Sequence, residues 1–251
     1  MFTYQYNTSE IEFDLIKSKR KTISISVDPK GNVLVKAPLR LSDKKVLELV
    51  KQKSSWIEQK LLLVEEAAGQ TKDKQYVNGE IFYYLGKEYI LHFIADTIKK
   101  RLTVNIYDDK LVVTIPTSKT GIINSGIIND GIVNEASIKV AITKWYKQMA
   151  KVKILERVTY YERLFPEKRG PVIVKEQKKR WGSCSQDGTL RFNWRIIMAP
   201  EYIIDYIVVH EMCHLRYMNH AREFWDLVQH IQPDYKIRKE WLKRNGITLE
   251  L

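Results

Sequence analysis

Three of the chain's five histidines lie within eleven residues: His210, His214 and His220. Glu211 directly follows the first of them. Four residues turn an α-helix by roughly 400°, so His210 and His214 would project from one face about one turn apart. Two imidazoles at that spacing can bind one metal ion. A straight helix cannot surround the ion, but residues 217–219 could turn the chain and bring His220 back as a third ligand.

This ligand set predicts a particular chemistry. Three histidines leave one coordination position open, which is typical of a catalytic zinc site rather than a structural one. Zinc lowers the pKa of its bound water to about 7, so hydroxide is available at neutral pH. Glu211 lies about 100° around the helix from His210, where it could take a proton from the metal-bound water and pass it to the leaving group. The pattern therefore predicts a zinc-dependent hydrolase with Glu211 as the general base.

The residues before the histidines favour a buried helix over a chance pattern on a solvated one. They are strongly apolar and include Ile203, Ile204, Ile207, Val208 and Val209. Two histidines and a glutamate in a buried helix would be costly without a partner. A bound metal ion would supply that partner.

Other side chains could also bind a metal ion. Glu223 could replace His220 as the third ligand. Cys184 and Cys213 are soft donors, but helical arithmetic points Cys213 away from the histidine face, so two buried thiols are expected. Two further histidines stand alone in the sequence and are expected in the core or on the surface: His92 and His230.

β-Strands dominate the first part of the chain. Alternating apolar residues separated by turn residues predict three hairpins, formed by residues 22–27 with 33–37, 81–85 with 89–94, and 102–106 with 111–115. Between the first and second hairpins, Ser42 caps a helix that is expected to continue to about Glu66. These strands are distant in sequence from the helix that carries the histidines, so they could position that helix only through tertiary packing.

The second part of the chain is more helical. Residues 121–135 carry three five-residue repeats, GIINS, GIIND and GIVNE, which are too short for a solenoid and mark a candidate boundary. The elements expected after them are a helix over residues 136–165, short strands at 172–175 and 189–194, and two closing helices, from Pro200 to about Tyr217 and from about His220 to Ile231.

Composition and charge limit the classes of protein. Hydrophobic residues make up 44% and charged residues 29% of the 251 residues, a balance that can bury a core. No apolar run is long enough to cross a membrane. With two cysteines and no signal peptide, a cytoplasmic protein is expected. The net charge of +12 attracts polyanions, although a lysine-rich surface that serves solubility explains it equally well.

Four stretches of the second half carry a family resemblance: RWGSCS at 180–185, LRFNWR at 190–195, VVHEMCHLRYMNHAREFW at 208–225 and PDY at 233–235. Together they resemble the bacterial metal-dependent hydrolases of the YgjP type, which are relatives of the SprT and WLM zinc metallopeptidases. The resemblance is strong over about residues 170–244 and loose before them. It implies that the three clustered histidines are the metal ligands and that Glu211 is the catalytic glutamate.

The resemblance also implies an α+β architecture. We expect an N-terminal β-rich region with one helix over residues 1–135, and a C-terminal zincin-like domain over 136–251, in which the HExxH helix packs beside a small sheet. In zincin-like folds a strand beside this helix binds extended substrate through its backbone. Arg180 and Ser183 are therefore candidate substrate contacts, Arg180 as an anion contact. The alternative is a structural turn with Trp181 in the core.

The expected function is zinc-dependent peptide hydrolysis, with Glu211 acting on a metal-bound water. Two alternatives remain open at this point. A metal-dependent nucleotide pyrophosphatase would suit the basic surface and Arg180. A DNA-associated protease of the SprT and WLM kind would suit the net charge, although the sequence contains no zinc finger or helix-turn-helix motif. The expected partners are a peptide or nucleotide substrate and, through the basic surface, non-specific nucleic acid.

Overall fold

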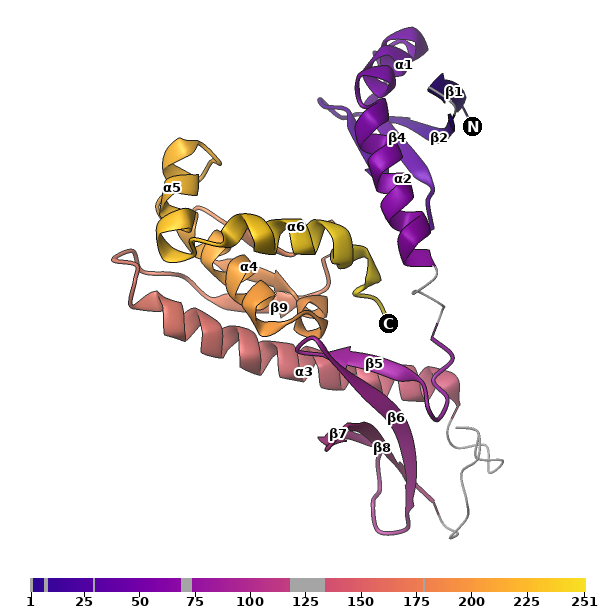
Figure 1. Cartoon of the computed structure of the whole chain (residues 1–251), viewed down its shortest axis with the longest axis vertical. Helices are drawn as coiled ribbons and strands as arrows, with labels where there is room; N and C mark the ends of the chain where they lie inside the picture. The colour runs from indigo at the N-terminus through magenta and orange to yellow at the C-terminus, as the bar shows by residue number, and fades with distance from the viewer. Residues whose placement is uncertain (1, 7–8, 29, 69–73, 118–133, 178) are drawn as a thin grey trace. The chain divides into compact units, whose positions relative to one another are not determined.

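Two separate hydrophobic cores organise the computed structural model of this chain (Figure 1). The structure describes residues 2–6, 9–28, 30–68, 74–117, 134–177 and 179–251. Its contacts divide the chain into two units, Met1–Lys72 and Asp73–Leu251. The mixed α+β composition is confirmed, whereas the boundary predicted at residue 135 must be moved to residue 72. The five-residue repeats lie outside the described residues as far as residue 133.

A four-stranded sheet forms the base of the first unit. Its strands are β1 (Phe2–Tyr6), β2 (Ser9–Ser18), β3 (Ser24–Val27) and β4 (Val33–Pro38), in the order β1-β2-β4-β3. The predicted hairpin is confirmed as β3 and β4, and β4 also pairs in parallel with β2. Alternation along β4 turns Val33, Val35 and Ala37 into the core, where they meet Ile11 and Phe13 of β2.

The single helix expected in this unit is two helices, α1 (Asp43–Gln52) and α2 (Ser54–Ala68). Its predicted start is confirmed, because the Ser42 Oγ accepts a hydrogen bond of 3.3 Å from the Lys45 backbone N–H. At the break, the Lys53 N–H donates to the Val50 carbonyl at 2.9 Å. The Ser54 hydroxyl donates to the same carbonyl at 3.2 Å. These bonds compete with the regular helical pattern.

The second unit begins with another four-stranded sheet. Its strands are β5 (Ile81–Tyr84), β6 (Lys87–Asp96), β7 (Thr103–Tyr107) and β8 (Lys110–Pro116), in the order β5-β6-β8-β7. Both predicted hairpins are confirmed, and the two are joined by parallel pairing of β6 with β8. The long helix α3 (Glu135–Glu162) follows and buries every fourth residue from Ile138 to Val158.

A small sheet and three further α-helices complete this unit. The strands β9 (Val172–Lys175), β10 (Gly182–Cys184) and β11 (Leu190–Asn193) lie in the order β10-β11-β9. The helices are η1 (Trp194–Met198, 3₁₀), α4 (Glu201–Cys213), α5 (Arg222–Ile231), α6 (Tyr235–Asn245) and η2 (Gly246–Thr248, 3₁₀). Figure 1 shows α4 between α3 and α6, and α4 also contacts β10. The expected HExxH helix beside a small sheet is confirmed. The helix α6 follows the two closing helices that were predicted and was not itself predicted.

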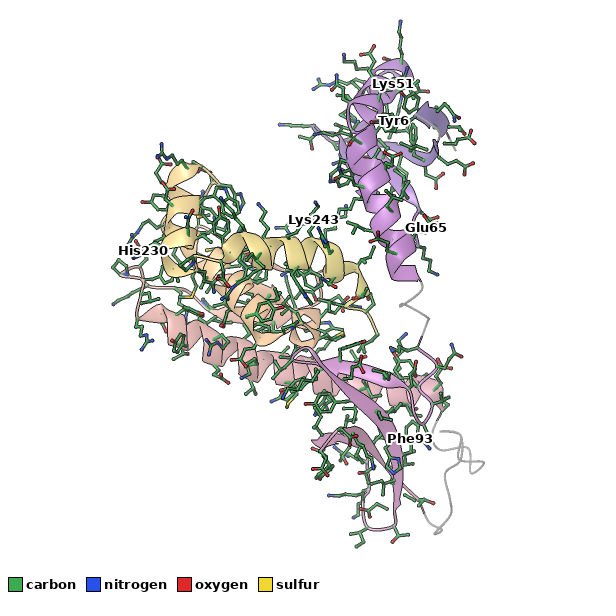
Figure 2. The ribbon with its side chains drawn as sticks, viewed as in Figure 1. Tyr6, Lys51, Glu65, Phe93, His230 and Lys243 are labelled. Atoms are coloured by element: carbon green, nitrogen blue, oxygen red, sulfur yellow. The ribbon has the colours of Figure 1, made fainter. Side chains whose placement is uncertain are left out.

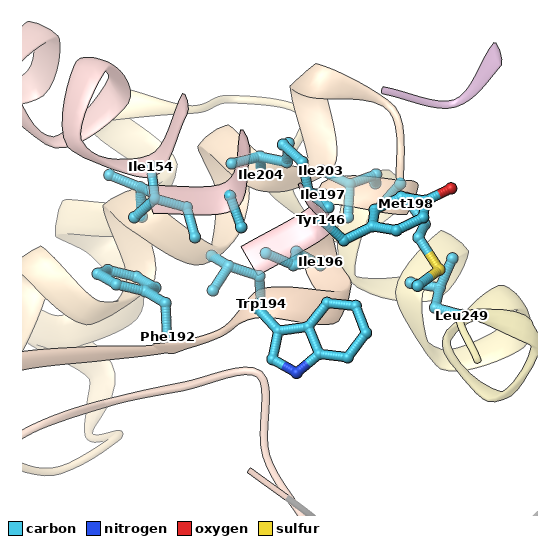
Figure 3. Close-up of a cluster of buried hydrophobic side chains, with 14 of the residues drawn as sticks. Tyr146, Ile154, Phe192, Trp194, Ile196, Ile197, Met198, Ile203, Ile204 and Leu249 are labelled. Carbon is cyan, nitrogen blue, oxygen red and sulfur yellow. The ribbon is translucent and has the colours of Figure 1, made fainter. Parts of the chain in front are cut away.

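One core joins both sheets of the second unit and explains the position of the boundary. Figure 3 shows Tyr146 of α3, Trp194 of η1 and Ile204 of α4 within one buried cluster. The Tyr146 hydroxyl donates to the Tyr83 carbonyl of β5 at 2.6 Å. The sheet β5–β8 therefore belongs with the histidine helix rather than with the first unit. Among the described helices, none has the length and apolar character needed to span a lipid bilayer.

Candidate metal centre

The three clustered histidines come together because α4 ends early. The helix expected to reach Tyr217 ends at Cys213, and His214 is its C-cap. A turn follows, in which the Tyr217 N–H donates to the Cys213 carbonyl at 3.0 Å. The next helix, α5, begins only at Arg222. The intervening residues fold back and carry His220 to the side chains at the end of α4.

The imidazoles of His210, His214 and His220 converge. Each offers one ring nitrogen, and these atoms all lie within 4.8 Å of one another. The Nε2 atoms of His210 and His220 are 3.1 Å apart, and the ring centroids of His214 and His220 are 4.7 Å apart. Glu223, the alternative third ligand, is exposed and is not part of this group. The geometry therefore favours His220 over Glu223.

The turn after α4 also fixes one of the rings. The Nδ1 of His214 is 2.8 Å from the Tyr217 carbonyl oxygen. A carbonyl can only accept, so Nδ1 carries the proton and Nε2 keeps its lone pair for a metal. Histidine ligands are commonly oriented by such a bond to their second nitrogen.

The protonation states suit a cation site. Burial, together with repulsion from His214, His220 and Lys239 in their charged forms, lowers the pKa of His210 to about 3. Burial also lowers the pKa of His220. Neutral imidazoles with converging lone pairs are the form that binds a divalent ion. The residues present therefore fit a metal ion held by three histidines.

Glu211 faces a different neighbour from the histidines. Its side chain is only 5% exposed, and burial raises its pKa to about 8. The positive charge of Arg180 acts in the opposite direction, as does a hydrogen bond from the backbone N–H of Cys184. Cys184 belongs to β10, so Glu211 is directed at the edge strand of the small sheet.

Gly182 makes this close approach of β10 to α4 possible. A Cβ atom on residue 182 would lie 2.6 Å from both the Cγ and the Oε1 of Glu211. No side chain larger than hydrogen fits there without movement. Gly182 was not among the residues predicted for the site, although a glycine within a strand often marks the close approach of another group.

Aromatic side chains of α5 surround the histidine cluster. Phe224 is fully buried, and its ring centroid lies 5.0, 4.5 and 4.8 Å from those of His210, His214 and His220. Trp225 stacks on His220, with centroids 5.6 Å apart and planes at 27°. These contacts restrict the positions of the three imidazoles. Sequence reasoning did not connect either aromatic residue with the histidines.

The remaining candidate residues occupy less central positions. Arg180 is exposed and precedes β10. Ser183 pairs with Arg191 of β11, and because it alternates with Gly182 its side chain projects from the other face of the strand. Cys213 is buried, whereas Cys184 is only half-buried, and neither belongs to the histidine group. The lone histidines are both exposed: His92 on β6 and His230 on α5 (Figure 2).

Comparison with known proteins covers most of the chain. The model of the YgjP-like family, metallopeptidase domain, matches residues 21–245. None of the curated proteins compared matches the sequence. Two solved metallopeptidase zymogens are similar: jannalysin of Methanocaldococcus jannaschii, at 19% identity and a TM-score of 0.32 over 39% of this chain and 96% of that one, and abylysin of Pyrococcus abyssi, at 21% identity and a TM-score of 0.30 over 36% and 89%.

Proposed function

This chain belongs to the YgjP-like metallopeptidase family, and from that premise we propose that it hydrolyses peptide bonds with one zinc ion held by His210, His214 and His220. The observation that carries the proposal is the convergence of three ring nitrogens within 4.8 Å, next to a buried carboxylate on the same helix. A metallopeptidase requires a divalent metal, and three imidazoles that leave a coordination position open suit catalytic zinc.

Glu211, Cys184 and Phe224 would each have a separate role in this reaction. When bound, zinc acts as a Lewis acid that polarises a carbonyl and makes water more acidic. A carboxylate oxygen of Glu211 accepts a proton from the attacking water and returns it to the leaving amine. The Cys184 N–H holds that carboxylate in place. Phe224 excludes water from the inner side of the imidazoles, because its ring packs against all three.

β10 offers a place for the substrate. It lies at one edge of the sheet order β10-β11-β9, so its outer side pairs with no described strand, and the Cys184 N–H on that side bonds Glu211. An extended peptide could add to this edge through main-chain hydrogen bonds. The scissile bond would then pass beside Glu211, since the β10 residue Gly182 touches that side chain.

Two substitutions separate metal binding from catalysis. His214→Ala should lose the bound zinc. Glu211→Gln should keep about one zinc per chain and lose at least about a hundredfold in peptidase activity, the range that general-base catalysis supplies. His230→Ala is the matched control, because His230 is exposed and outside the group, and it should keep both. Full activity in Glu211→Gln, or zinc loss from it, would contradict the proposed role.

A row of lysines favours a second candidate activity, non-specific binding of nucleic acid. Lys139, Lys144, Lys147 and Lys151 line a groove of about 720 Å³ between α3 and Val174 of β9. The first and last of them are twelve residues apart on the helix, or about 18 Å. A DNA strand carries one charge about every 3.4 Å along its axis, so about five phosphates fit that length.

Salt dependence tests this second activity. Replacing two lysines that contact DNA phosphates should reduce the slope of log affinity against log salt by about 2. We therefore expect that change in the double variant Lys144→Gln, Lys151→Gln. The control is Lys87→Gln, Lys110→Gln, which removes two exposed lysines elsewhere in the same unit. Equal slopes in wild type and both double variants would exclude the α3 groove as the binding surface.

A further inference from the structure

Lys239 lies at the edge of the histidine cluster, although it belongs to a helix that contains none of the three histidines. It belongs to α6, and its Nζ is 4.2 Å from the centroid of the Trp225 ring. That ring is 5.6 Å from the ring of His220 and 5.7 Å from the ring of His210, centroid to centroid. The ammonium is close enough for its charge to act on both imidazoles. It therefore forms one rim of the candidate site.

Arg180 provides a cation on the other side. It lies two residues before Gly182, whose Cα packs against Glu211. Its side chain is exposed, and its positive charge acts on the Glu211 carboxylate. One cation therefore lies beside the histidines and another beside the candidate base.

Most acidic side chains at α5 and α6 pair with cations other than Lys239. On α5, Glu223 is exposed in the first turn. The other acidic side chains at α5 and α6 pair with cations: Asp226 with Arg222 at 3.6 Å, Asp234 with Arg238 at 2.9 Å and Glu240 with Arg244 at 3.0 Å. In the part of the chain that the structure describes, no ion pair includes Lys239 or Arg180. Two cations without a carboxylate partner among the described residues, one beside the histidines and one beside Glu211, attract an anionic ligand.

We propose that Lys239 and Arg180 form an anion subsite that selects peptides with a carboxylate next to the bond that is cleaved. The proposal rests on the peptidase function proposed above and specifies its substrate. A carboxylate is the anion that peptides supply, either at an aspartate or glutamate side chain or at the C-terminus. Hydrogen bonds between charged groups are roughly twice as strong as neutral ones. The subsite would also offset the repulsion between such a substrate and the Glu211 carboxylate.

A matched set of fluorogenic peptides tests the subsite. One pair differs only by aspartate or asparagine beside the scissile bond. A second pair has asparagine there and differs only by a free or an amidated C-terminus one residue beyond it. For the zinc-loaded full chain we expect kcat/KM to be about tenfold higher for the charged member of at least one pair, as one charged hydrogen bond supplies. The pair that shows the difference identifies the source of the carboxylate.

Two variants on α6 assign the preference to a residue. Lys239→Met removes the charge and keeps a flexible stem against Trp225, so the preference should fall to within about twofold while zinc content is unchanged. Lys243→Met is the control, one turn further along α6 (Figure 2), where the lysine pairs with Glu240 at 3.6 Å. It should retain the preference of the wild type. Arg180→Met should weaken the preference as Lys239→Met does.

The possible results distinguish a failure of the anion subsite from a failure of the peptidase function. Cleavage of the charged and neutral peptides at equal rates, or a preference that survives in Lys239→Met, contradicts the subsite and leaves the peptidase function standing. No cleavage of any peptide contradicts both. The protein could also hydrolyse a nucleoside triphosphate. If Lys239→Met slows that reaction and leaves peptide cleavage unchanged, the two cations bind phosphate and the carboxylate subsite is wrong.

Discussion

Replacing Gly182 with alanine should displace the Glu211 carboxylate without touching the three histidines. The added Cβ would lie 2.6 Å from the Cγ and Oε1 of Glu211 and 2.8 Å from its Cδ. Carbon atoms in good contact are about 3.5–4.0 Å apart, so relief requires a movement of about 1 Å. α4 cannot supply it easily, because Val208 and Met212 on either side of Glu211 are fully buried. The movement therefore falls on β10 and on the Glu211 side chain.

The magnitude follows from this displacement. Overpacking of this kind costs about 1–3 kcal/mol of stability. A misplacement of about 1 Å in a catalytic group can cost about a hundredfold in rate. We therefore expect kcat/KM of the Gly182→Ala protein to fall by about a hundredfold, while its zinc content stays at the wild-type value. Zinc analysis and peptidase kinetics on the same preparation measure both quantities.

Gly170→Ala is the matched control for crowding. Its Cβ would lie 2.9 Å from the Asp187 carbonyl oxygen and 3.0 Å from the Thr189 nitrogen, away from Glu211. This variant should lose stability as Gly182→Ala does, but its kcat/KM per folded molecule should remain within about threefold of wild type. If Gly182→Ala keeps wild-type activity, or if both variants lose activity equally when fully folded, then Gly182 does not serve the position of Glu211.

Three further predictions concern the metal and the boundary between the units. Trp225→Ala should weaken zinc binding by about 10–100-fold, the usual cost of losing a residue that orients a ligand, whereas Trp225→Phe should retain most of the affinity; equal affinity in the two variants would contradict a stacking role for Trp225. Chelation should lower the unfolding temperature of the second unit alone, since zinc at 100 times its Kd adds about 2.7 kcal/mol; calorimetry that shows a shift of the first unit instead would contradict the assignment. A fragment of residues 73–251 should fold and bind zinc, whereas a fragment of residues 136–251 should not, because the shorter fragment lacks the sheet β5–β8. Circular dichroism and zinc analysis distinguish the two fragments, and a folded shorter fragment would support the boundary at 135 instead.

Local patterns predicted much of this fold. The three hairpins were recognised because their alternating residues and turn residues are adjacent in sequence. The helix around His210 was recognised because its apolar residues and its histidine spacing share one period. In both cases the information lies within about twenty residues, and sequence reading is strongest at that range.

Long-range pairing could not be predicted in the same way. The parallel pairs β2 with β4 and β6 with β8 join strands whose partners nothing in the local sequence specifies. The strands β1 and β2 pair locally and were missed for a different reason, because the alternation of Ile11, Phe13 and Leu15 with acidic residues along β2 was not recognised. The second of these parallel pairs also determines the boundary, because it links two hairpins into the sheet that shares a core with α3. The five-residue repeats at 121–135 therefore predicted the boundary between the units less well than this shared core defines it.

The candidate site shows how one helix can hold two kinds of group in different surroundings. Helical geometry turns His210 and His214 toward the turn after α4 and toward Phe224, and it turns Glu211 toward β10. Burial then acts on both, lowering the pKa of His210 and raising that of Glu211. Unprotonated imidazoles are free to bind a cation, and a buried carboxylate is stabilised by a positive charge nearby. A cation held by the three histidines would meet both conditions at once, which is the physical reason for reading these four residues as one site rather than as two independent features of α4.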